Sequence, residues 1–370
     1  MSRVRLFLVG DPEAPKDVPL LRPSSLLVAL LALLVAASTL RFGGPHWTLN
    51  PNATDHLRHE YAAWAFLQEG FRIFSTPIAE WSVTAAHPHV TWEAFPEVYP
   101  PGLVLFFLPF GTISNLGLVP DKVVHILMVM TLAGGAVVAS FQLLRTLSLR
   151  YEWTLAVLLA VFGTVLYVRF GANGFFDPIA AGVALAGIYW IDRGAYGRAL
   201  IALATAFSLH FRLFYLWPIA IALVLRRWRE MRPWQLALST VLAVLALGAF
   251  VLAAPAVSGL DRIRGVSPNP LALTDGVTSH KLLVLVLALG LLLLVHVTER
   301  QLAVTASVAL ALVLIFGVAQ WQAWYPVLMS PILALARTRW AQVGLAVGFA
   351  EIGGFTDLAK TLSLFARQIV

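Results

Sequence analysis

Long apolar runs separated by short basic clusters constrain this chain more than any other feature of its sequence. Of its 370 residues, 59% are hydrophobic and only 12% are charged. A helix that crosses a bilayer needs roughly 20 apolar residues, and only helices or closed barrels satisfy their backbone hydrogen bonds in lipid. The runs are continuous rather than alternating, which favours helices over barrel strands. We therefore expect an all-α polytopic membrane protein with about 11–12 transmembrane helices.

The basic clusters predict which side of the membrane each loop faces. Basic residues precede the first apolar run, Ser24 to Leu40, and place residues 1–23 in the cytoplasm. This polar start is long for a cleaved signal, so the run is expected to remain as the first span. The net charge of +7 comes from such clusters and does not indicate binding to nucleic acid. Further spans are expected near 121–144, 153–170, 176–192, 199–211, 213–225, 234–257, 282–298, 302–319, 324–336 and 340–355.

Residues 24–370 are expected to form a single integral membrane domain with extracytoplasmic loops at 41–98 and 258–281. The apolar stretch 99–117 has two interpretations, because two crossings before Arg145 would leave that arginine outside. It either crosses the membrane, against the usual charge bias, or forms a re-entrant or interfacial helix. The stretch 199–225 is basic at both ends and interrupted by a polar segment, so it predicts a tight hairpin of two short or broken helices.

The first extracytoplasmic loop holds the densest cluster of ionisable groups in the chain. The spacing of Tyr61, Trp64 and Phe71 predicts an amphipathic helix at the membrane surface, beginning at Thr54 or Asp55. An aspartate at this position often only caps a helix, yet here an external carboxylate is also placed to meet a hydroxyl group. The cluster comprises Asp55, His56, Arg58, His59 and Glu60.

Two further positions have a structural and a functional interpretation. Asp177 precedes Pro178 at the external end of an expected span, where it fits a helix cap as well as a site on the same side as Asp55. His210 and Arg212 interrupt the apolar hairpin, and a cation at membrane depth is costly unless it has a partner or a function. A lipid phosphate is such a partner, because arginine grips it with two parallel hydrogen bonds. Snorkelling to the interface is the alternative.

Aromatic residues and histidines give weaker signals. Tyr99 opens a Tyr-Pro-Pro-Gly entry to an apolar helix, and Trp324 and Tyr325 lie at an external helix end. Membrane-interface belts and sugar-stacking platforms have the same aromatic composition. The histidine spacings in the first loop fit no tight ligand pattern, so we expect no metal site and no required cofactor, although a divalent metal stays possible. The chain has no cysteine, which excludes disulfides and thiolate chemistry.

Taken in order, these segments resemble the GT-C superfamily of membrane glycosyltransferases, and most of all bacterial mannosyltransferases that use polyprenyl-phosphate sugars. The likeness covers roughly residues 24–340 and rests on the succession of short motifs. Two departures stand out: His210 or Arg212 replaces a lysine frequent in the broken hairpin, and Phe175-Phe176 precedes the second acid. The matching motifs are the first loop with Asp55, Tyr61 and Gly70, YPPG at 99–102, NGFFDP at 173–178, the hairpin base before Pro218, and WYP at 324–326.

The resemblance implies an inverting transfer of a sugar, mannose first, from a polyprenyl phosphate to a lipid, glycan or protein acceptor. Asp55 would take the proton from the acceptor hydroxyl, while Arg212 with His210 would neutralise the lipid phosphate. The site would face the extracytoplasmic side of a bacterial inner membrane. Membrane lipids are further expected partners. The expected substrate-binding residues are Arg58, His59, Glu60, Tyr99, Asp177, Trp324 and Tyr325.

Three rival functions remain open from the sequence. A small-solute transporter suits broken helices and a cation at membrane depth, but no half-chain repeat is visible. A non-catalytic GT-C-derived membrane subunit or scaffold predicts that Asp55 and Arg212 can be replaced without harm beyond stability. A polysaccharide polymerase or lipid-linked ligase usually carries its large external loop late in the chain, whereas here that loop directly follows the first span.

Overall fold

The computed structural model describes residues 55–82, 96–146, 174–257 and 325–335, with Gly171, Ala303, Ala306, Ser307, Leu310 and Ala311. These residues are largely helical, and no strand occurs among them. The segment 1–23 expected in the cytoplasm, the expected first span, the loop expected at 258–281 and the spans expected near 153–170, 282–298 and 340–355 lie outside the described residues.

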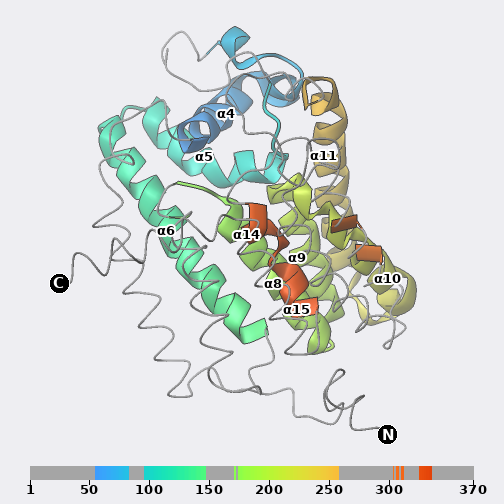
Figure 1. Ribbon diagram of the computed structural model, residues 1–370. Coiled ribbons are helices and arrows are strands. Elements are labelled where there is room, and N and C mark those ends of the chain that lie inside the picture. Colours follow the sequence, from blue (N-terminus) through green and yellow to red (C-terminus); the bar gives the residue numbers. More distant parts are fainter. Residues whose placement is uncertain are drawn as a thin grey trace, which may run out of the picture.

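The described helices follow the chain in a simple order (Figure 1). Short 3-10 turns, labelled η, connect several of them and carry part of the site described below. The α-helices are α4 (Asp55–Glu69), α5 (Pro101–Asn115), α6 (Asp121–Thr146), α8 (Asp177–Asp192), α9 (Tyr196–Leu209), α10 (Trp217–Arg227), α11 (Pro233–Val257), α14 (Tyr325–Met329) and α15 (Pro331–Leu335). The 3-10 turns are η2 (Gly70–Phe74), η3 (Ile78–Glu80), η5 (Phe211–Leu216) and η6 (Trp228–Glu230).

Two of the described helices are long and apolar enough to cross a membrane. They are α6, over Val123–Leu143, and α11, over Pro233–Ala253. Only 22% of the apolar window of α11 is buried, and 44% of that of α6, whereas the core helix of a soluble protein is mostly buried. Both helices lie where the apolar runs 121–144 and 234–257 predict them. α8 occupies the run 176–192 as a helix, but with 16 residues it is not among the described helices long enough to cross a membrane.

The stretch 99–117 folds as a helix too short to cross a bilayer comfortably. At a rise of about 1.5 Å per residue, the length of α5 is roughly 22 Å, against a hydrocarbon core of about 30 Å. Its first residue is Pro101, where a missing backbone N–H costs nothing because the first turn has no partner for it. This length favours the re-entrant or interfacial interpretation of the stretch.

The hairpin expected over 199–225 is present and broken at its polar interruption. α9 ends at Leu209, His210 is extended, with φ −149° and ψ 114°, and η5 then leads into α10. Pro218 occupies the first turn of α10, where proline is tolerated. Arg227, at the end of α10, pairs with Glu230 at 2.8 Å, and this contact raises the pKa of the arginine.

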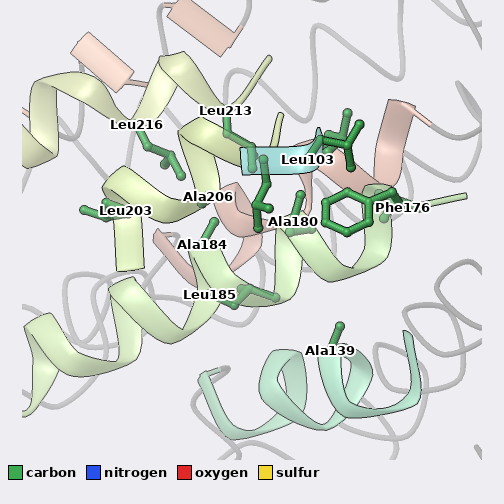
Figure 2. Close-up of a cluster of buried hydrophobic side chains, with 14 of the residues drawn as sticks. Leu103, Ala139, Phe176, Ala180, Ala184, Leu185, Leu203, Ala206, Leu213 and Leu216 are labelled. Carbon is green, nitrogen blue, oxygen red and sulfur yellow. The ribbon is translucent and has the colours of Figure 1, made fainter. Parts of the chain in front are cut away.

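α8 is the central helix of the described residues. It packs against α6 on one side and α9 on the other, and α14 and α15 also contact it. Small side chains make this close packing possible, since they let neighbouring helix backbones approach. Figure 2 shows how Ala180 and Ala184 of α8 meet leucines from α9 and η5. These contacts hold the hairpin apex beside the first turn of α8.

α4 and α5 lie together at one end of the described helices, at the top of Figure 1. α5 also contacts α9, so this helix pair touches the hairpin directly. Leu103 of α5 reaches the same buried cluster as Phe176, which precedes α8 (Figure 2). The start of α5, the start of α8 and the end of α9 are thereby brought to one region.

Candidate functional site

Three polar residues in the first half of α4 are buried rather than exposed to solvent. Arg58, His59 and Glu60 are each buried, although sequence periodicity placed the apolar Tyr61, Trp64 and Phe71 on the packing face. Phe71 instead lies exposed in η2. The sequence predicted which apolar residues of α4 share a face, and the structure adds that these three polar residues are buried. For Arg58, the segment 96–100 supplies polar partners that compensate the burial of its charge.

Arg58 holds the segment 96–100 against α4. Its Nη2 donates to the carbonyl of Pro96 at 2.8 Å, and its Nε lies 3.6 Å from Oε2 of Glu97. The side chains of Arg58 and Glu97 are 6% and 0% exposed. An ion pair so deeply buried is stable only with good geometry and further hydrogen bonds.

Glu97 supplies those further bonds and is the residue that sequence reasoning missed. Its Oε1 accepts from the backbone N–H of Tyr99 at 2.9 Å, and its own N–H donates to the carbonyl of Ile73 in η2 at 2.9 Å. In the sequence Glu97 is one of several acids in the first loop. Its only distinguishing signal is its place two residues before the Tyr-Pro-Pro-Gly entry to α5.

The Tyr99 ring lies between two histidines from distant parts of the chain. Its centroid is 4.8 Å from that of His59 and 5.2 Å from that of His210, and both contacts are edge-on. Edge-on geometry is the favourable arrangement for aromatic rings at these distances. Tyr99 therefore connects α4 to the apex of the hairpin.

His210 meets Asp177 at the hairpin apex. Its Nδ1 accepts from the backbone N–H of Arg212 at 3.2 Å, and its Nε2 lies 3.5 Å from Oδ1 of Asp177. A neutral imidazole in this setting carries its proton on Nε2, facing the carboxylate. Asp177 is not the N-cap residue that the capping interpretation expects, because Phe176 holds that position and Asp177 is the first residue of α8.

Arg212 lies in η5, two residues beyond His210, and is half-buried. Its guanidinium carbon is 5.8 Å from the centroid of the Phe211 ring. The turn that carries it, η5, is anchored to α14, because the Tyr215 hydroxyl donates to the carbonyl of Leu328 at 2.9 Å. Arg212 is thus held near the Asp177–His210 pair on a fixed turn.

Removing this anchor should destabilise the protein measurably. Tyr215→Phe is expected to lower the free energy of unfolding by about 1–3 kcal/mol, because the buried Leu328 carbonyl loses its donor. Tyr189→Phe is the matched control: its hydroxyl accepts from Arg145 in an exposed bond, and its loss should cost under about 0.5 kcal/mol. Denaturant unfolding of the solubilised variants measures both. Equal losses in the two variants would contradict a specific anchor at Tyr215.

The structure brings together five of the expected site residues and leaves others outside its description. Arg58, His59, Tyr99, Asp177 and His210 form one connected group, and Glu60 is buried beside them on α4. Asp55 is the first residue of α4 and Tyr325 the first of α14, and the side chains of both lie outside the described residues, as does all of Trp324. Within the described ranges, no group of three or more histidines or acids is placed to hold a metal ion.

The connected group joins a carboxylate–imidazole pair to a second imidazole through an aromatic ring, with an arginine on the adjoining turn. Such an arrangement can orient polar substrate groups and favour a bound anion.

Comparisons with family models, with curated proteins and with solved structures found no match for this chain.

Proposed function

We propose that this chain is an integral membrane glycosyltransferase of the GT-C type. It moves a sugar, mannose in the first instance, from a polyprenyl-phosphate donor to a lipid, glycan or protein acceptor at the extracytoplasmic face of a bacterial inner membrane. The observation that carries the proposal is the convergence of α4, the segment 96–100, the start of α8 and the break after α9. These four parts of the chain bring together Arg58, His59, Tyr99, Asp177 and His210, which are five of the residues that the GT-C resemblance picks out.

The proposed reaction balances without a cofactor. The acceptor hydroxyl oxygen attacks the anomeric carbon of the sugar, and the bond from that carbon to the phosphate oxygen breaks. The hydroxyl proton passes to Asp55, and the polyprenyl phosphate leaves with the electron pair of the broken bond. A cation beside the leaving phosphate stabilises the charge that develops on it.

Within the proposal, the side chains of His210 and Arg212 suit different roles at the phosphate. Both nitrogens of His210 are engaged, one by the backbone of Arg212 and one by Asp177. Arg212 lies on the adjoining turn, and its guanidinium group suits bidentate binding of phosphate. We therefore assign the phosphate to Arg212 and an orienting role to His210.

Arg212→Ala tests this assignment. We expect the variant to bind farnesyl phosphate, a short polyprenyl-phosphate probe, at least about tenfold more weakly than the wild type, because a charge-assisted contact is lost. Polyprenyl phosphates that co-purify with the wild type should be depleted in the variant by mass spectrometry. Arg229→Ala, an exposed arginine in η6, is the control and should change neither result.

The same experiment separates the proposal from its rivals. Unchanged farnesyl phosphate affinity in Arg212→Ala would remove this residue from the site. Only bulk phospholipids in both preparations would favour the scaffold and transporter functions instead.

A further inference from the structure

Glu97 is a buried acid that the proposed reaction does not use. Its side chain is 0% exposed, and none of the sequence motifs assigns it a role. The free energy cost of burying a carboxylate is large unless a cation and hydrogen-bond donors compensate it. An apolar residue of similar size would fill the same space at a lower free energy cost, so the presence of a carboxylate here calls for a specific role.

Two partners of the Glu97 side chain belong to the walls of the candidate site. Arg58 comes from the second turn of α4, and the Tyr99 N–H from the entry to α5. Arg58 also binds the carbonyl of Pro96, so its guanidinium holds the segment 96–100 at two points, this carbonyl and the Glu97 carboxylate. We call Glu97, Arg58, Pro96 and the Tyr99 N–H the Glu97 clamp.

The clamp sets the position of Tyr99, and Tyr99 touches both halves of the site. On one side its ring meets His59, which lies one helical turn after Asp55 on α4. On the other side it meets His210, the partner of Asp177. Any shift of the segment 96–100 therefore changes the spacing between α4 and the hairpin apex that carries Arg212.

We infer that Glu97 is a positioning residue that fixes α4, with Asp55, at the correct distance from the hairpin that holds the donor phosphate. This inference rests on the proposed function. Glu97 does not touch the substrate, because its side chain is fully buried and its oxygens face Arg58 and the Tyr99 backbone. Arg58 belongs to the same clamp and acts as a positioning residue rather than as a substrate ligand.

The test compares single and paired replacements. Glu97→Gln keeps an oxygen for the Tyr99 N–H but removes the charge that faces Arg58. We expect kcat for transfer from polyprenyl-phosphate mannose to octyl mannoside to fall about 10- to 100-fold, since a misplacement of about 1 Å can cost a factor of about 100. Farnesyl phosphate binding should stay within about twofold of the wild type. Glu80→Gln, an exposed acid in η3, is the control and should leave both quantities unchanged.

A double variant separates positioning from folding. Glu97→Gln alone leaves the buried charge of Arg58 without its partner and should lower the free energy of unfolding. The double variant Arg58→Met with Glu97→Gln removes both buried charges, so its free energy of unfolding should lie closer to that of the wild type than does that of Glu97→Gln. The clamp is absent from it, so kcat should stay low. Recovery of kcat together with stability would overturn the inference, because Glu97 would then serve only the fold. Wild-type kcat in Glu97→Gln would overturn it as well.

Hydrogen–deuterium exchange tests the clamp without any activity. In Glu97→Gln we expect faster exchange in peptides covering 96–104 and 206–216, and no change in α6. Unchanged or uniformly faster exchange would overturn the positioning role. If the wild type transfers no sugar but this local pattern is found, the proposed function fails while the clamp stands.

Discussion

Replacing Asp55 with asparagine should reduce sugar transfer by about 10²–10⁴-fold, the loss that follows removal of a general base. An amide cannot accept the proton of the acceptor hydroxyl at neutral pH, whereas its size and its capacity to begin a helix are nearly those of aspartate. Farnesyl phosphate binding should remain within about twofold of the wild type, because the phosphate is assigned to Arg212 on η5. Transfer from polyprenyl-phosphate mannose to octyl mannoside, measured with saturating donor, gives the comparison.

Glu69→Gln supplies the matched control for this experiment. Glu69 ends the same helix, and its Oε1 accepts from the Ser82 N–H at 2.7 Å, away from the connected group. The same carboxylate-to-amide change there should alter transfer less than about threefold. Joint loss of transfer, donor binding and stability in Asp55→Asn would point to a role in folding. Full transfer in that variant would exclude Asp55 as the base.

Gly102→Ala should destabilise the protein by about 1–3 kcal/mol, the range found for overpacked interiors. A Cβ atom on Gly102 would lie 2.5 Å from the backbone oxygen of Ser208 and 2.5 Å from its Oγ. A backbone atom cannot rotate away as a side chain does, so α5 and α9 would have to separate. That separation would also pull Tyr99 away from His210, and transfer should fall together with stability.

Gly134→Ala tests whether the effect arises from contact or from the loss of a glycine. Gly134 lies within α6, where an added Cβ would meet nothing within 4 Å among the described residues. Alanine is the better helix former by about 0.8–1.0 kcal/mol, so this variant should be as stable as the wild type or more stable. Thermal unfolding in one detergent compares the two. Equal stability of both variants would contradict the close approach of α5 and α9.

Helix positions in the described part of the chain were largely predictable. The apolar runs placed α6, α8 and α11 within a few residues of their ends, and the polar break SLHFR placed the interruption at His210. These features are local. Apolar length, proline at a first turn and a polar interruption act over one or two helical turns, so they can be read from neighbouring residues.

The direction of the charges was not predictable in the same way. Periodicity did not predict that Arg58 is buried, because the partners that compensate its charge, Pro96 and Glu97, lie 38 and 39 positions further along the chain. The sequence also could not predict the contact of Asp177 with His210, and a functional role for Asp177 stays a prediction. Whether a charge is buried depends on the polar partner opposite it, and that partner belongs to another segment.

By itself, then, the sequence determined the helical class, the positions of α6 and α11 and the broken hairpin, whereas the expected 11–12 spans and the roles of the site residues stay predictions. The tertiary structure alone decided that Arg58, His59 and Glu60 of α4 are buried, that Tyr99 joins His59 to His210, and that Glu97 lies with them. The physical reason is the separation along the chain of the residues that interact. Helix formation follows from neighbours a few residues apart, whereas compensation of a buried charge requires a partner that only the packing of distant helices supplies.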